Sequence, residues 1–136
     1  MLSFEQALML ASHVFAEGRV RGSAPLAVAV VDASGTPVVM HRADGAPPMW
    51  ARIALAKAQT AVQFGCSSAQ VQQLSEEYPA LMGSIAPLVD GPMVTAAGGI
   101  VLRREGAVVG AVGVSGDTSE TDAACAAAAA EQLGLG

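Results

Sequence analysis

The first apolar pattern along the chain is helical. Over residues 3–18 the apolar side chains recur at the spacing of one buried helix face. Ser3 and Gln6 stand at the two positions of an N-terminal capping box, and Gly18 suits the position that follows a helix. The pattern therefore predicts a helix over residues 3–18.

An extended pattern follows this helix. Residues 24–32 form a run of small and β-branched apolar side chains, which is typical of a buried strand. The sequence Asp32-Ala33-Ser34-Gly35 has the composition of a tight turn, and residues 36–42 resume the strand pattern. Together these segments predict a β-hairpin.

The middle of the chain changes from helical to irregular. Residues 48–64 predict a helix that ends at Gly65, and residues 68–77 predict a shorter one. Residues 78–95 contain several prolines and glycines and show no clear period. They predict a long loop without secondary structure, and long loops often form the walls or lids of binding sites.

The C-terminal part repeats the hairpin-and-helix order. Residues 100–104 and 108–115 predict two strands joined by a turn at Glu105-Gly106. Residues 117–133 predict an alanine-rich helix that begins with acidic residues, which suit the positive end of a helix dipole. Tight hairpins imply antiparallel strands, so the order of elements predicts an α+β fold with a mainly antiparallel sheet covered by helices.

Composition adds a subunit interface to this picture. The 136 residues favour one domain over 1–136; 52% of them are hydrophobic and only 14% are charged, against about 25% charged in a typical domain. No apolar run is long enough to predict a membrane span. We therefore expect a homo-oligomer, whether a dimer or a larger assembly, to bury the surplus apolar surface.

Charge and cysteine usage exclude other classes of function. The net charge is −5 and the single lysine and six arginines are scattered, so no basic stripe for nucleic acid or an anionic membrane surface is predicted. Cys66 and Cys125 lack the spacing of metal ligands, and no metal site is predicted. Free thiols and an N-terminus without secretory character predict a cytoplasmic protein.

Four blocks of the sequence resemble a known family. They are AVAVVDASGTPV at 27–38, HRADGAP at 41–47, ARIALAKAQTAVQFG at 51–65 and GGIVLRREGAVVGAVGVSGDTSETDAACAAAA at 98–129. In order and spacing they resemble the GlcG/HbpS-like family, which includes haem-binding proteins and the C-terminal domain of some corrinoid-related proteins. The resemblance implies a profilin-like fold with a five-stranded antiparallel sheet, a homo-oligomer, and haem as the ligand of some members.

The first group of candidate site residues surrounds the turn after the second strand. Arg42, Asp44 and Gly45 belong to this turn, and Lys57 is isolated among apolar residues of the next helix. A lysine in such surroundings would act as an anion ligand, or as a base if burial lowers its pKa. The alternative is structural: Asp44 caps the turn, Arg42 pairs with it, and Lys57 reaches solvent along its apolar stem.

The second group lies at the last two strands. Ser115, Gly116 and Asp117 lead into a helix N-terminus, whose N–H groups suit a carboxylate of haem or of a small acid, unless these residues simply cap the helix. Gly98 and Gly99 would permit close approach of a ligand, or they form a bulge or turn.

Three functions remain open at this point. The leading hypothesis is a small-ligand-binding protein that holds haem or a small carboxylated metabolite. If haem is bound, the candidate iron ligands are His41, His13, Tyr78 and the methionines near the long loop, although a lone histidine is more often structural or exposed. The second is an isomerase, tautomerase or lyase acting on a small organic acid, with Lys57 and Asp44 as acid and base. The third is a non-catalytic accessory subunit. An aromatic content of 4% favours a ligand smaller than haem.

Overall fold

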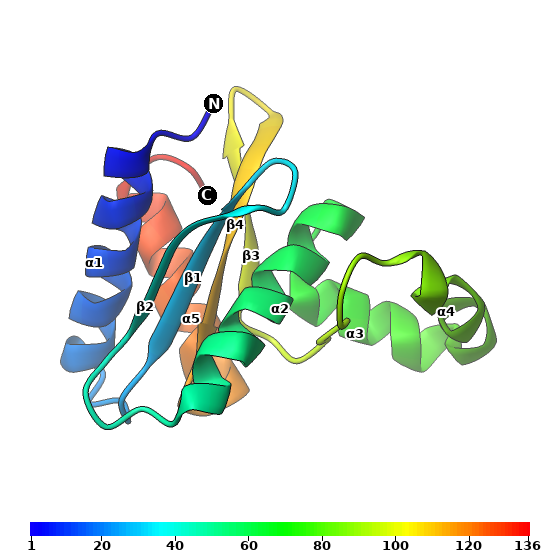
Figure 1. The fold of residues 1–136 in the computed structure, drawn as a ribbon, viewed down its shortest axis with the longest axis horizontal. Coiled ribbons are helices and arrows are strands. Elements are labelled where there is room, and N and C mark those ends of the chain that lie inside the picture. Colours follow the sequence, from blue (N-terminus) through cyan, green and yellow to red (C-terminus); the bar gives the residue numbers. More distant parts are fainter.

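The computed structural model describes residues 1–136. Five α-helices and four strands follow one another in the α+β order that the sequence predicts (Figure 1). The elements are α1 (Phe4–Val20), β1 (Ala27–Asp32), β2 (Pro37–Arg42), α2 (Pro48–Phe64), α3 (Ser68–Glu77), α4 (Pro79–Ile85), the 3₁₀ turn η1 (Ala86–Leu88), β3 (Gly99–Arg104), β4 (Ala107–Ser115) and α5 (Ser119–Gln132).

The four strands form one antiparallel sheet in the order β2-β1-β4-β3. The register places Arg42 of β2, Ala27 of β1 and Ser115 of β4 in one row at the same end of the sheet. Segments that the sequence singled out separately are therefore neighbours in space. This row, and the elements that flank it, position the candidate site.

Helices cover both faces of the sheet (Figure 1). Helices α1 and α5 pack on one face, where Val28, Val30, Val112 and Val114 contribute to the main core. Helix α2 packs on the other face, where the intervening small residues of β1 and β4 meet Ala54, Ala58 and Ala61. Successive residues of a strand point to opposite faces of the sheet. Because these strands are apolar throughout, each face of the sheet packs its own core against its helices.

Close contact between α2 and β4 depends on a glycine. A Cβ atom on Gly113 would lie 1.9 Å from the carbonyl oxygen of Ala54. Any other residue at this position would push the helix away from the sheet. The small residues along α2 serve the same close packing, and so they need no functional explanation.

The sheet has four strands, and the expectation of a fifth, which came from the family resemblance, is wrong. The segment between η1 and β3 is bound to helix α2 instead of extending the sheet. Asp90 exchanges hydrogen bonds with the Gln63 side chain, and the N–H of Val94 donates to Thr60 Oγ1 at 3.1 Å. Its backbone groups are partly satisfied in this way, and β3 remains an edge strand.

The long structureless loop predicted over residues 78–95 is also wrong in part. Residues 79–85 form α4, which begins with Pro79 at its first position, and η1 follows. The helices α3 and α4 project away from the sheet, as Figure 1 shows. The other predicted elements are confirmed to within a few residues. None of the helices combines the length and the apolar character that a membrane span requires.

Candidate functional site

A hollow of about 380 Å³ lies between α1 and the end of β2. We call it the basic hollow, because its polar side chains are two arginines, a histidine and a serine, and none is acidic. Its lining consists of Ser12, Phe15, Arg19, His41, Arg42 and Ala43. On a chain with a net charge of −5, a concave surface with this lining is the clearest place for an anion.

Arg42 is held in place from one side only. Its Nη1 donates a hydrogen bond of 2.7 Å to the carbonyl oxygen of Ala46 in the turn that follows β2. No carboxylate lies within 4 Å of the guanidinium, so the predicted pairing with Asp44 does not occur. A guanidinium carries five N–H donors, so a fixed Arg42 still has donors for a ligand.

Arg19 and His41 complete the positive lining. Arg19 stands in the last turn of α1, and its side chain makes neither an ion pair nor a hydrogen bond within the chain. His41 precedes Arg42 on β2 and is exposed to solvent. Arg19 and Arg42 together offer two unpaired cations beside one imidazole and the ring of Phe15. This combination suits a carboxylate or another oxyanion.

A second, smaller hollow adjoins the basic hollow. We call it the side hollow; its volume is about 140 Å³, and it shares Phe15, Arg19 and Ala43 with the basic hollow. The rest of its lining comes from the segment before β1, at Ser23, Ala24, Pro25 and Leu26. Apart from Arg19 and Ser23, these side chains are apolar.

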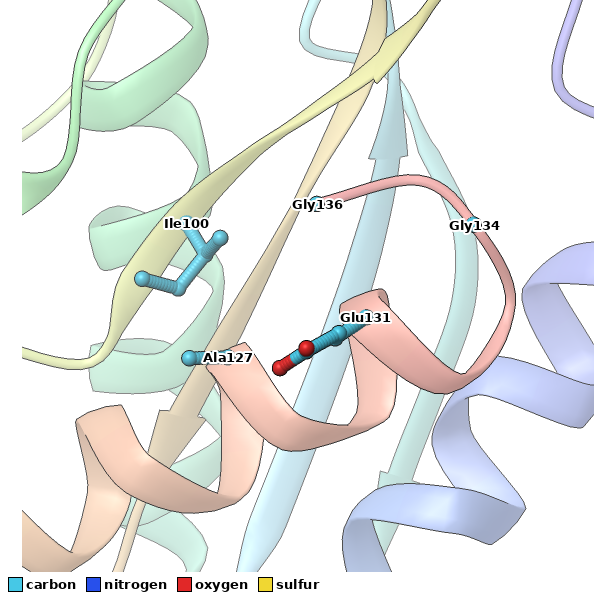
Figure 2. Close-up of a pocket in the computed structure, with 5 residues that line it drawn as sticks. All are labelled: Ile100, Ala127, Glu131, Gly134 and Gly136. Atoms are coloured by element: carbon cyan, nitrogen blue, oxygen red, sulfur yellow. The ribbon is translucent and has the colours of Figure 1, made fainter.

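The largest hollow of the chain lacks this chemistry. It measures about 530 Å³ and lies between β3 and the C-terminal end of α5 (Figure 2). Figure 2 shows the carboxylate of Glu131 as the only charged side chain beside Ile100 and Ala127. A negative side chain without a cation disfavours carboxylated ligands there.

Another hollow contains a thiol. Its volume is about 260 Å³, and its lining includes Cys66. Burial raises the pKa of the Cys66 thiol, so this thiol is less reactive at neutral pH than an ordinary one.

Lys57 is buried in an ion pair. Its side chain is 3% exposed, and Nζ lies 3.2 Å from Oδ2 of Asp122 in α5, which is also 3% exposed. Nζ also donates a 2.8 Å hydrogen bond to the carbonyl oxygen of Val114. Lys57 therefore does not reach solvent along its stem, and it lines none of the four hollows.

The surroundings of this pair shift both of its pKa values. Burial lowers the pKa of the Lys57 amine, and the neighbouring carboxylate of Asp122 acts in the opposite direction. Burial raises the pKa of Asp122, while the N–H of Asp117 and the Lys57 amine act to lower it. Each charge is thus tolerated because the other is present.

Gly98 and Gly99 lie against this pair and against α2. A Cβ atom on Gly98 would be 2.8 Å from Nζ of Lys57, and one on Gly99 would be 2.3 Å from the Lys57 carbonyl oxygen. The space beside both glycines is thus filled by Lys57. In this structure the two glycines allow α2 and the Lys57 side chain to approach closely. The close approach is therefore made by the chain itself and not by a ligand.

The residues before α5 bind their own backbone. Ser115 is buried, and Asp117 accepts hydrogen bonds from the N–H groups of Ala24 and Thr118 at 2.8 Å each. Asp122 accepts from the N–H of Asp117, and Thr118 is the N-cap of the helix. The N–H groups of Asp117 and Thr118, which an external anion approaching the helix start would meet, already donate to the chain's own carboxylates.

Of the remaining predicted site residues, two stay at the surface. Asp44 and Gly45 are exposed, and Gly45 takes a positive φ of 84° in the turn. Arg42 is the predicted site residue that opens into a hollow of suitable charge. His13 is half-buried on α1, outside that lining. No group of three or more His, Cys, Asp or Glu side chains is placed to hold a metal ion.

Two parts of this arrangement were missed by sequence reasoning. The contribution of α1, through Ser12, Phe15 and Arg19, arises from packing and leaves no sequence motif. The ion pair did leave a signal: Asp122 falls at helical spacing with the buried Cys125, Ala126 and Ala129. An aspartate on a buried helix face needs a buried cation, and the chain has only one lysine.

The comparison with protein families is decisive for classification. Residues 2–131 match the family described as haem degrading protein HbpS-like. The chain belongs to this HbpS-like family. The sequence blocks around the turn after β2, in α2 and in the second hairpin predicted this membership, and the prediction is confirmed.

Curated relatives extend the comparison to a larger protein. The chain is 33% identical over 112 residues, which are 82% of its length, to the corrinoid adenosyltransferase PduO of Salmonella typhimurium. It is 34% identical over 98 residues, or 72% of its length, to PduO of Citrobacter freundii. The matched regions are 33% and 29% of those proteins, so the chain spans about a third of the length of these relatives.

Solved structures share the fold over nearly the whole chain. The PduOC:heme complex has a TM-score of 0.88 and 30% identity, and the match covers 99% of this chain and 96% of that one. A double mutant of Streptomyces reticuli HbpS has a TM-score of 0.84 and 29% identity, with 97% and 86% covered. One of these two neighbours is thus a complex with haem.

Proposed function

We propose that this HbpS-like chain is a small-ligand-binding protein that holds a carboxylated ligand in the basic hollow. One observation carries the proposal: Arg19 and Arg42 line the same hollow with no carboxylate within 4 Å of either. Unpaired guanidinium groups in a concave surface favour an oxyanion, and a carboxylate can take two parallel hydrogen bonds from each.

Haem is one candidate for this ligand, and the lining suits its chemistry. The two guanidinium groups would hold the propionates, and His41 supplies an imidazole of the kind that ligates haem iron. A haem complex among the structural neighbours supports this choice. Phe15 is the only aromatic side chain in the lining, so a smaller organic acid is equally well served by the hollow.

The enzyme alternative with Lys57 as acid or base receives less support from the geometry. The Lys57 amine is engaged by Asp122 and by the Val114 carbonyl, and it faces no hollow. A general base must lie within hydrogen-bond reach of the proton that it removes. Asp44 stands at the surface, and no lysine or arginine lies within 4 Å of its carboxylate.

Titration tests the proposal with two probes, haemin followed by absorbance and acetate followed by amide chemical shifts. The variants are Arg42→Gln, Arg19→Gln and His41→Ala. Arg52→Gln is the matched control, because Arg52 is exposed on α2 and lies outside the basic hollow. We expect saturable binding of at least one probe, weakened about tenfold or more by each arginine variant, as the loss of a charge-assisted hydrogen bond of about 1.5–3 kcal/mol implies.

The His41 variant separates the two ligands. If haem is bound through its iron, His41→Ala removes the absorbance band of a ligated haem, whereas acetate binding is little affected. Binding of both probes that is equally strong in the wild type, in Arg42→Gln and in Arg19→Gln would refute the proposal. So would the absence of saturable binding of either probe.

A further inference from the structure

The two adjoining hollows have opposite chemistry. The basic hollow presents Arg19, His41 and Arg42, whereas Pro25, Leu26 and Ala24 line the side hollow. Phe15, Arg19 and Ala43 belong to both linings, so the two hollows form one continuous surface. A ligand whose charged group is held by the arginines can therefore extend its other end into the side hollow.

Three backbone groups of the side hollow are already hydrogen-bonded. The N–H of Ala24 donates to Asp117, and the carbonyl oxygen of Ala24 accepts from the hydroxyl of Ser23 at 2.9 Å. Pro25 has no N–H. The carbonyl oxygen of Leu26 accepts from the N–H of Ala43 at 2.9 Å. Away from Arg19, which it shares with the basic hollow, the side hollow therefore presents mainly hydrogen-bonded backbone and apolar side chains, which favour hydrocarbon over hydroxyl groups.

A carboxylate stands close to the side hollow. Oδ2 of Asp117 lies 2.8 Å from the N–H nitrogen of Ala24, one of the lining residues. The backbone N–H groups of Ala24 and Thr118 lower the pKa of Asp117, so its carboxyl group is ionised at neutral pH. A second negative charge entering the side hollow would meet this carboxylate at close range, which is unfavourable.

The side hollow is also small. Its volume of about 140 Å³ is less than half of the roughly 300 Å³ at which pockets for drug-sized ligands begin. It admits a short hydrocarbon chain, and it excludes a macrocycle or a large aromatic system.

From these observations we infer that the basic and side hollows together select a monocarboxylic acid with a short aliphatic tail, its carboxylate on Arg19 and Arg42 and its tail against Pro25 and Leu26. The inference rests on the proposed function, because it needs the carboxylate to occupy the basic hollow. It goes further in naming the ligand class and in placing the tail.

A chain-length series tests this inference. Acetate, butyrate, hexanoate and succinate are titrated into the protein and followed by amide chemical shifts and calorimetry. We expect affinity to rise about fourfold for each methylene that enters the side hollow, the fold-change that corresponds to about 0.8 kcal/mol per buried methylene. The gain should stop once the tail exceeds the side hollow, and succinate should bind more weakly than butyrate.

Two variants locate the tail. Ala24→Leu, at a residue that lines the side hollow but not the basic hollow, should abolish the gain from acetate to butyrate while acetate still binds. Ala33→Leu, in an exposed turn, is its matched control. Asp117→Asn should reduce the discrimination against succinate. Thermal melts check that each variant folds. In the wild type, butyrate but not acetate should shift the amide signals of Ala24 and Leu26, a result that does not depend on any variant.

The outcomes separate this inference from the proposed function. If the acids bind through Arg42 with no dependence on chain length, the tail assignment is wrong and the basic hollow still binds carboxylates. The same conclusion follows if haemin binds through Arg42 and the aliphatic acids do not. If none of these ligands depends on Arg42 or Arg19, both proposals are refuted together.

Discussion

The buried ion pair between α2 and α5 offers the sharpest test of the structure. Lys57→Met keeps an unbranched apolar stem that is one atom shorter and removes the charge. The variant leaves the carboxylate of Asp122 in a site that is 3% exposed, where backbone N–H groups such as that of Asp117 still donate to it. We expect a large loss of stability, since an unpaired charge is left inside the protein.

The size of this loss follows from the geometry. Two unit charges at the observed 3.2 Å attract each other by about 5 kcal/mol when the effective dielectric constant is about 20. Desolvation of the two groups opposes this attraction, so the pair as a whole adds little net stability. Removal of one partner, however, keeps the desolvation of the other, and it typically costs about 3–5 kcal/mol. We expect a value near 3 kcal/mol, because Asp122 can be neutralised by a proton.

A double-mutant cycle measures the coupling. Urea unfolding, followed by far-UV circular dichroism and by the fluorescence of Trp50, the only tryptophan, gives the free energy of unfolding. The cycle uses Lys57→Met, Asp122→Asn and the double variant. Asparagine keeps an acceptor oxygen for the N–H of Asp117. The double variant should be more stable than the sum of the single losses predicts, by about 2–3 kcal/mol, within the range found for contacting residues.

The pH dependence of Lys57→Met gives an independent check. Burial raises the pKa of Asp122 above its ordinary value of 3.8, and removal of Lys57 also removes a cation that lowers it. A group with a raised folded-state pKa contributes stability at low pH, and that contribution is lost as pH rises through the folded-state value. The deficit of Lys57→Met should therefore be largest at neutral pH and should shrink as pH falls toward 3.8. Additive single losses together with a deficit below 1 kcal/mol at pH 7 would refute the buried pair.

Two further predictions concern packing and helix capping. Gly113→Ala should lower the melting temperature strongly, because its Cβ atom would lie 1.9 Å from the Ala54 carbonyl oxygen. In the control Gly83→Ala the added Cβ meets no atom within 4 Å, so this variant should melt at the wild-type temperature or higher. Equal melting temperatures of both variants would contradict the close contact of α2 and β4. Asp117→Asn should destabilise the protein above pH 3.8, the ordinary pKa of aspartate, because backbone donors lower the pKa of Asp117 in the folded state. This contribution is lost as pH falls through the folded-state value, so the difference in stability from the wild type should vanish in acid. A difference that does not change between about pH 2 and about pH 7, a range that includes the usual carboxyl pKa of about 3.9, would contradict this prediction.

The elements that the sequence predicted well are those whose signals are local. The capping box of Ser3 and Gln6, the left-handed Gly65 after α2 and the turn at Glu105 and Gly106 are all present in the structure. Helix α4 was missed because its seven residues are too few for a helical period, and they lie in a segment rich in proline. Its placement depends on packing against α3, which local patterns do not contain.

The site was harder to predict because its charges come from distant parts of the chain. Arg19 and Arg42 are brought together by the packing of α1 on β2, and no spacing in the sequence reports this contact. The isolated Lys57 attracted attention for a sound reason, since a lone lysine among apolar residues must be accommodated somehow. Its partner could be found only by asking which carboxylate also lies on a buried helix face, and Asp122 is the one that does.

The start of α5 shows why the same chemistry can serve structure or function. A helix N-terminus favours an anion, and the sequence supplied both the donors and two candidate anions of its own. In the structure Asp122 accepts from the N–H of Asp117, and Asp117 accepts from the N–H of Thr118, so two carboxylates of the chain itself lie at the helix start. Arg19 and Arg42, by contrast, have no carboxylate within 4 Å. Because Asp117 accepts a hydrogen bond from Ala24, which lines the side hollow, the carboxylate that completes the fold would at the same time exclude ligands with a second negative charge.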